Sequence, residues 1–214
     1  MANDPFSGLY SDPYAVLRIK RSVEALNARP GHTVLDVGCY EQLAYTFLPK
    51  GVIYEGIDLD RFHPFTNVVN IDGGFEHEPV DRILCLETLE HLMRPQGTLK
   101  SIRACLKDDG VAVISLPNEA TLFHRVRALL GTVDQEAFGE CGKHLHMPNM
   151  KQSIRFLSQE LSVVQAIPYA SDGAGTRSPW LRPLLRILPL ELLARLLPSL
   201  FARGFIFVCK KNIN

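Results

Sequence analysis

Two short apolar strands, each closed by a turn residue, dominate residues 33–60 and limit what the chain can fold into. Val34–Val37 is a largely β-branched run that Gly38 ends, and Val52–Ile57 is a second run that Asp58 ends. Continuous runs of this kind are typical of strands buried on both faces of a parallel sheet. The sequence therefore predicts an α/β fold with loops gathered at the carboxyl edge of the sheet, where ligands bind in open α/β folds.

Asp58 indicates what that edge binds. A carboxylate accepts two hydrogen bonds side by side, so an acid at the end of a second strand can bind both hydroxyls of a ribose. The first hypothesis is therefore a cofactor that carries a nucleoside.

Four sequence blocks together resemble the signature of a known family. LDVGCYEQ, GIDLD, DRILCLETLEHL and GVAVISLPN resemble, in order and spacing, the signature of class I S-adenosylmethionine-dependent methyltransferases, over residues 30–160. The resemblance implies a Rossmann-like α/β fold with a seven-stranded sheet, mostly parallel with an antiparallel last strand, and helices on both faces. The length of 214 residues fits one domain over residues 1–214, with a helical lead-in at 1–30 and a Leu/Arg/Pro-rich helical insert at about 178–203. The implied cofactor is S-adenosyl-L-methionine.

The first loop departs from the family pattern D-x-G-x-G-x-G. Asp36 and Gly38 are present, but Tyr40 and Gln42 stand at the later glycine positions. Glycines there let the backbone approach the ligand and adopt positive φ. Tyr40 either lines the cofactor pocket or blocks it, so the alternative function is a catalytically degenerate binding or scaffold protein. A nicotinamide dehydrogenase ranks third, because no GxGxxG follows the first strand.

The resemblance assigns cofactor-binding residues at the ends of several strands. It places Asp72 beside the adenine, although Asp-Gly-Gly is also an ordinary turn after a third strand at Val68–Ile71. Glu87 follows a fourth strand and faces the methionine part of the cofactor. The expected cofactor-binding set is Asp36, Gly38, Tyr40, Asp58, Leu59, Asp72, Gly73 and Glu87.

Two helices are expected next to this site. Tyr14–Ala28 has helical periodicity and either covers the cofactor, as in the resembling family, or only packs on the sheet. Glu41–Leu48 is predicted as the first crossover helix, with its N-terminal N–H groups directed at the cofactor. Glu41 is either a ligand contact or a first-turn carboxylate favoured by the helix dipole.

The remaining elements follow from periodicity and turn residues. The sequence predicts strands at Asp81–Leu86, Val111–Leu116, Leu161–Tyr169 and Gly204–Cys209, helices at Gln96–Leu106, Thr121–Leu130 and Met150–Glu160, and a turn at Lys107–Gly110.

His144 and His91 are the candidate catalytic residues. A neutral imidazole takes a proton from a hydroxyl near pH 7, so His144 is the candidate general base and His91 can reach the substrate. For each, a structural histidine held by hydrogen bonds is the alternative. His144 and His146 share one face of an extended segment, but no acid or Cys follows at ligand spacing, so no metal site is predicted.

A second, softer resemblance concerns the acceptor. PNEATLFHRVRALLG and KHLHMPNMKQSIRFL are similar to a subgroup of these methyltransferases associated with modification of bacterial cell-surface polysaccharides or lipid-linked sugars. It implies O-methylation of a small-molecule or lipid-linked sugar acceptor, in polysaccharide biosynthesis.

The composition limits which binding partners and which cellular compartment we expect. The chain has 23 basic and 23 acidic residues without a basic cluster, which argues against a nucleic-acid partner. Its five cysteines form no CxxC pair and are typical of reduced cytosolic thiols. The polar, turn-rich N-terminus lacks the apolar core of a signal peptide. We expect a cytoplasmic protein.

The Leu-rich stretch 178–203 leaves several possibilities open. Its arginines and prolines argue against a transmembrane helix. Short amphipathic helices fit better, and they can contact the inner face of a membrane peripherally, cover a lipid-linked substrate, form a homodimer interface or pack on the domain.

Overall fold

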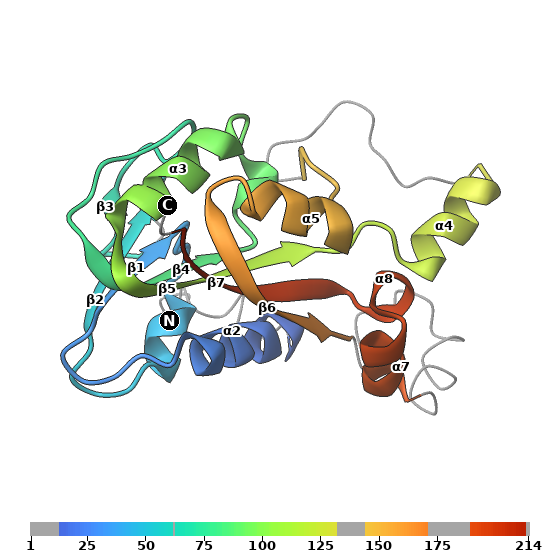
Figure 1. The fold of residues 1–214 in the computed structure, drawn as a ribbon, viewed down its shortest axis with the longest axis horizontal. Helices are drawn as coiled ribbons and strands as arrows, with labels where there is room; N and C mark the ends of the chain where they lie inside the picture. The colour runs from blue at the N-terminus through green and yellow to red at the C-terminus, as the bar shows by residue number, and fades with distance from the viewer. Residues whose placement is uncertain (1–12, 62, 132–143, 171–188, 213–214) are drawn as a thin grey trace, which may run out of the picture.

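Seven strands form one sheet at the centre of the protein (Figure 1). The structure, a computed structural model, describes residues 13–61, 63–131, 144–170 and 189–212. Within these residues the strand order is β3-β2-β1-β4-β5-β7-β6. The strands are β1 (Thr33–Val37), β2 (Ile53–Asp58), β3 (Asn67–Val68), β4 (Val80–Leu86), β5 (Leu106–Pro117), β6 (Leu161–Tyr169) and β7 (Gly204–Lys211).

The strand directions confirm the predicted fold class. β1 pairs in parallel with β2 and β4, and β2–β3 and β4–β5 are also parallel. β7 lies antiparallel between β5 and β6. The carboxyl ends of the parallel strands therefore meet at one edge of the sheet, as expected, and the loops that follow them can form a common site.

Helices cover both faces of the sheet, which explains the continuous apolar strands. In Figure 1, α3 (Pro95–Cys105) and α5 (Met150–Leu157) lie on one face and α2 (Pro13–Leu26) on the other. Alternate strand residues supply two cores, since Leu35 joins the cluster under α3 and α5 while Val34 joins the cluster under α2. Burial on both faces leaves no polar face in the central strands.

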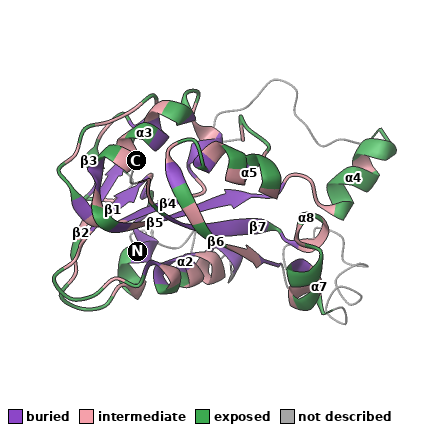
Figure 2. Cartoon of the chain, in the orientation of Figure 1, coloured by how far each residue is buried: buried purple, intermediate pink, exposed green. Residues whose placement is uncertain are grey.

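The peripheral helices lie beyond β5 and β7. They are α4 (Leu122–Leu129), α7 (Leu190–Leu196) and α8 (Pro198–Phe201). Figure 2 shows the central strands mostly buried and α4 mostly exposed. In the part of the chain that the structure describes, no helix combines the length and the apolar character needed to cross a membrane.

Three predicted elements are wrong in part. The crossover at Glu41–Leu48 is a short 3-10 helix, η1 (Leu43–Phe47), preceded by Gln42 in a left-handed conformation. The third strand has only two residues and ends at Val68. The predicted turn at Lys107–Gly110 lies inside β5, which already pairs with Val80 at Leu106 and shifts register before Val111.

The other predicted helices and strands agree with the structure within a few residues. The predicted insert at 178–203 lies partly outside the described residues, which resume at Pro189.

Candidate active site

The turn after β1 is built around Gly38. Its φ is +74°, a conformation that favours glycine, and the backbone N–H groups of Gly38 and Cys39 donate to the carbonyl of Ile57 at the end of β2 (2.9 and 3.2 Å). A Cβ on Gly38 would lie 2.4 Å from the side chain of Thr88. The turn is therefore held between β2 and the loop after β4, with no room for a side chain.

Tyr40 and Gln42 keep the backbone conformation of glycine although they are not glycines. Their φ values are +44° and +57°. The Gln42 side chain is buried and its Nε2 donates to Thr66 Oγ1 (3.0 Å). A Cβ on Gly56 would lie 2.9 Å from Gln42 Nε2, so the absence of a side chain at position 56 makes room for Gln42. Tyr40 is 43% exposed and is not packed into the core.

Asp58 closes this loop from the end of β2. Its Oδ2 accepts from the Tyr40 backbone N–H (2.9 Å) and its Oδ1 from that of Leu59 (2.7 Å). Burial raises the pKa of Asp58, and these backbone hydrogen bonds oppose the rise. Since a carboxylate offers about four acceptor positions, Asp58 keeps acceptor capacity for a ligand hydroxyl beside its backbone hydrogen bonds.

Asp36 lies beneath the loop and is 3% exposed. The Tyr54 hydroxyl donates to its Oδ2 (2.8 Å). Burial raises the pKa of Asp36 to about 7, and the hydrogen bond from Tyr54 opposes the rise. Asp36 is therefore a buried group whose charge depends on pH.

Glu87 follows β4 with φ +51° and faces inward. The Ser115 hydroxyl donates to Glu87 Oε1 (3.1 Å), and Tyr169 Oη lies 3.5 Å from the same oxygen. Arg18 of α2 pairs with the other oxygen (3.5 Å). Glu87 thus lies at the predicted edge of the sheet, and side chains from three elements, α2, β5 and β6, hold its carboxylate.

Arg18 is a residue that sequence reasoning missed. Its Nε is buried without a hydrogen-bond partner among the described residues. A signal existed, because Arg18 lies four residues from both Tyr14 and Ser22, on the helix face that packs against the sheet. A basic side chain on such a face indicates a buried anionic partner.

Asp72 and Gly73 form a turn that is fastened to the start of α3. Asp72 Oδ1 accepts from the Arg94 backbone N–H (2.7 Å), and a Cβ on Gly97 would lie 2.1 Å from the Gly73 carbonyl oxygen. Asp72 therefore has a structural partner in addition to its expected adenine contact. Glu41, in contrast, precedes η1 and is buried, so the interpretation as a first-turn carboxylate is wrong.

A second group of candidate residues lies on η2 (Leu89–His91) and on the segment 144–148, which are far apart in sequence. The backbone N–H groups of Leu145 and His146 both donate to the Glu90 carbonyl oxygen (2.8 and 3.1 Å). The structure thereby brings the two predicted histidines together, with the rings of His91 and His144 4.9 Å apart.

Acidic residues flank His144 on both sides. Its Nδ1 lies 2.8 Å from Glu119 Oε1, and its Nε2 lies 4.0 Å from Glu90 Oε1. The hydrogen bond with His144 lowers the pKa of Glu119, whereas burial raises the pKa of Glu90 to about 9. The Nε2 atom of His146 instead lies 2.9 Å from the Leu92 carbonyl oxygen. His144 and His146 therefore do not share a face.

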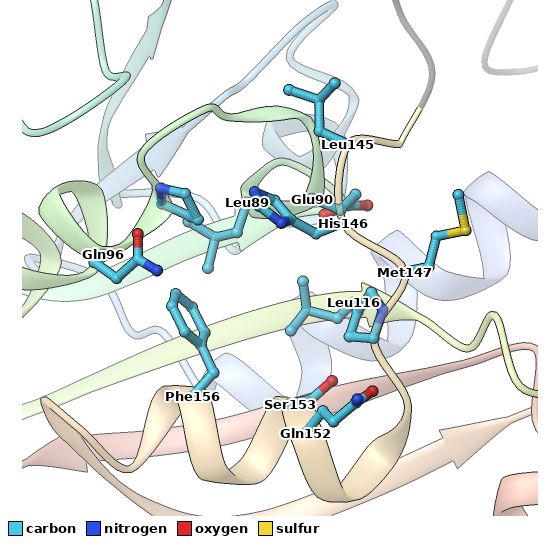
Figure 3. Close-up of a pocket in the computed structure, with 12 residues that line it drawn as sticks. Leu89, Glu90, Gln96, Leu116, Leu145, His146, Met147, Gln152, Ser153 and Phe156 are labelled. Atoms are coloured by element: carbon cyan, nitrogen blue, oxygen red, sulfur yellow. The ribbon is translucent and has the colours of Figure 1, made fainter. Parts of the chain in front are cut away.

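A cavity of about 390 Å³ opens beside this group (Figure 3). Its walls come from η2, the end of β5, the segment 144–148 and α5. The apolar lining includes Leu89, Leu116, Leu145, Met147 and Phe156, and the polar lining includes Glu90, Gln96 and His146. A molecule with an apolar body and a polar reacting group fits this lining.

The sequence of the chain is similar to those of known proteins. Residues 14–162 match a family described as a methyltransferase domain. The chain is 32% identical over 123 residues to the ubiquinone biosynthesis O-methyltransferase of Glaesserella parasuis, covering 48% of this chain and 52% of that one. The corresponding enzyme of Haemophilus ducreyi is 32% identical over 109 residues, covering 41% and 46%. The chain thus spans about half the length of these relatives.

Solved structures share the fold at low sequence identity. The N-methyltransferase NodS from Bradyrhizobium japonicum, in complex with S-adenosyl-L-homocysteine, has a TM-score of 0.61 at 14% identity, covering 99% of this chain and 94% of that one. A putative methyltransferase from Haloferax volcanii, in complex with the activator Trm112, has a TM-score of 0.64 at 15% identity, covering 92% and 89%.

Proposed function

The chain belongs to the class I S-adenosylmethionine-dependent methyltransferases, and we propose that it methylates a hydroxyl of a small-molecule or lipid-linked acceptor. The observation that carries this proposal is the loop between β1 and β2. Tyr40 and Gln42 hold the left-handed backbone that glycines usually provide, and Gly56 accommodates the Gln42 side chain. A loop with this shape fits S-adenosyl-L-methionine, the family's cofactor, and argues against closure of the site.

Each residue at the edge has a part in holding that cofactor. Asp58 has acceptor positions left for the ribose hydroxyls, and Asp72 for the adenine amino group. Glu87 suits the positively charged amino group of the methionine part, and the buried Nε of Arg18 suits its carboxylate. The bound cofactor supplies an activated methyl group on its sulfonium.

The protein mainly contributes proximity and orientation to a transfer of this kind. A hydroxyl acceptor must also lose its proton, and His144 beside the cavity is the candidate group to receive it. Glu119 holds the His144 ring through Nδ1 and so directs Nε2 away from itself, toward Glu90.

The apolar walls of the cavity favour an acceptor with an apolar portion. A lipid-linked sugar of the polysaccharide pathways fits, and so does an aromatic hydroxyl, since the curated relatives are ubiquinone biosynthesis O-methyltransferases.

Asp58→Ala should weaken the binding of S-adenosyl-L-homocysteine at least about tenfold, because it removes charge-assisted hydrogen bonds worth roughly 1.5–3 kcal/mol each. Isothermal titration measures the affinity, and circular dichroism checks the fold. The matched control is Asp60→Ala, which removes an exposed acid two residues away and should leave the affinity unchanged. Equal affinities for the wild type and Asp58→Ala would contradict the ribose assignment.

A peripheral membrane contact through α7 is a second part of the proposal. One face of α7 packs on the domain, because Ala194 is fully buried and Glu191 pairs with Arg21 of α2 (3.2 Å). The opposite side exposes Leu192 and Leu196, one helical turn apart, near Arg195. Apolar and basic side chains together suit an anionic lipid surface, and a homodimer is the competing use of the same face.

Leu192→Asp/Leu196→Asp should therefore reduce cosedimentation with phosphatidylglycerol vesicles at least about fivefold, since each change replaces apolar burial by charge repulsion. Val164→Asp, at an exposed apolar position of β6, is the control and should cosediment like the wild type. If the double variant pellets as well as the wild type, α7 is not the contact.

A further inference from the structure

We propose that Glu90, His91 and His144 bind a divalent transition-metal cation at the wall of the acceptor cavity. Each residue offers one ligand atom, and these three atoms lie within 4.8 Å of one another. Ligands at about 2.1 Å from a tetrahedral cation lie about 3.4 Å apart, so side-chain shifts of about an ångström complete the site. No element has to move for this, because backbone hydrogen bonds already join η2 to the segment 144–148.

The burial of the Glu90 carboxylate is the observation that indicates a ligand. Its side chain is fully buried, and among the described residues neither carboxylate oxygen has a hydrogen-bond partner. A buried carboxyl group without a partner costs several kcal/mol of stability. A cation between Glu90 and the two imidazole rings would bind one of these oxygens and offset the negative charge of the carboxylate.

His144 is oriented as a metal ligand would be. Glu119 Oε1 lies 2.8 Å from Nδ1, so a proton on Nδ1 can be donated to Glu119. The lone pair of Nε2 is then directed toward Glu90 Oε1, 4.0 Å away. Metal-bound histidines almost always donate their second N–H to a carboxylate or carbonyl in this way, which fixes the ring and its tautomer.

The ligand set indicates the class of cation. Two imidazole nitrogens and one carboxylate suit Zn²⁺, Fe²⁺, Co²⁺ or Mn²⁺, whereas Mg²⁺ and Ca²⁺ prefer oxygen alone. Three protein ligands leave at least one position open, as in catalytic sites. Because Glu90 lines the cavity, that position is available to an acceptor oxygen. With Nε2 of His144 bound to the cation, the cation rather than His144 would promote loss of the acceptor proton. This use of the cation rests on the proposed function, but the site itself does not.

The sequence predicts no metal site here. His144 and His146 were the only pair with short spacing, and they diverge in the structure. The ligands instead combine the Glu90-His91 pair with a histidine more than fifty residues later, a combination that only the fold can bring together.

The test measures binding of the cation directly, with the chain of residues 1–214 and without cofactor or acceptor. After treatment with EDTA, the protein should bind one equivalent of Zn²⁺ with micromolar or tighter affinity by isothermal titration. Co²⁺ should give visible d–d absorption of a site with nitrogen and oxygen ligands. Because both experiments use the wild-type chain, a variant that fails to fold cannot obscure the result.

Variants then identify the ligands. Glu90→Gln and His144→Ala should weaken Zn²⁺ binding at least about a hundredfold, and Glu119→Gln about ten- to a hundredfold, because it only orients His144. His146→Ala is the matched control for cation affinity, since His146 lies two residues away and contacts the Leu92 carbonyl oxygen. The inference is overturned if the wild type binds no stoichiometric Zn²⁺, or if His146→Ala loses as much affinity as His144→Ala. A failure of methyl transfer would leave both measurements unaffected.

Discussion

Asp36→Asn is expected to raise the free energy of unfolding at pH 8 by up to about 4 kcal/mol relative to the wild type. Burial raises the pKa of Asp36 from 3.8 to about 7 in the folded protein. A difference of about 3 pKa units corresponds to about 4 kcal/mol between the two protonation states. Asparagine has nearly the shape of a protonated aspartic acid and can still accept from the Tyr54 hydroxyl, so it removes the charge without removing the contact.

The direction of this effect follows from how the ionisation of Asp36 depends on pH in the folded and unfolded states. Below about pH 4, Asp36 is protonated in both states, and its contribution to stability is complete. Between pH 4 and 7 the unfolded chain releases the proton while the folded protein keeps it, so the contribution is lost as the pH rises through the folded pKa.

The measurement is urea denaturation of both proteins at pH 5, 6.5 and 8. The stability advantage of Asp36→Asn should be smallest at pH 5 and largest at pH 8, and the comparison with the wild type cancels the titration of all other groups. An advantage that is constant over this range, or that shrinks with rising pH, would show that Asp36 is ionised in the folded protein.

Gly38→Ala is expected to destabilise the protein by about 3 kcal/mol or more and to weaken binding of S-adenosyl-L-homocysteine more than tenfold. Two costs add at this position. The φ of +74° disfavours any side chain by about 1 kcal/mol, and the new Cβ would lie 2.4 Å from Thr88. The loop that carries Tyr40 must shift to relieve the clash, and the cofactor edge shifts with it.

Gly31→Ala separates the two costs. Gly31 also has a positive φ, +88°, but a Cβ there would meet nothing within 4 Å. It should cost only about 1 kcal/mol, the conformational part. If thermal melts show equal losses of stability for both variants, the contact with Thr88 is not tight, and the interpretation of Gly38 as a rigid turn is wrong.

The strands and most helices were predictable because their signals are local. Apolar runs that end in Gly38, Asp58 or Glu87 specify buried parallel strands, and parallel strands bring their carboxyl ends to one edge. The crossover at Glu41–Leu48 could not be predicted in the same way. Its helical pattern is outweighed by the left-handed backbone at Gln42, whose side chain is held by Thr66 and accommodated by Gly56.

The candidate site was predictable mainly where its residues lie at the ends of strands. Asp36, Asp58 and Glu87 lie where the strand ends put them. The partners that set their properties come from distant parts of the chain: Tyr54 for Asp36, Arg18 for Glu87, and Glu119 for His144. Such contacts depend on tertiary packing, which a single sequence does not display.

The most direct test of the central claim is calorimetric titration of the wild type with S-adenosyl-L-homocysteine. If the loop with Tyr40 and Gln42 is a cofactor loop, binding should be micromolar, and ligand at 100 times its dissociation constant should stabilise the fold by about 2.7 kcal/mol. No binding and no thermal shift at millimolar ligand would contradict the claim. The chain would then be a binding or scaffold protein that has kept the methyltransferase fold without its cofactor.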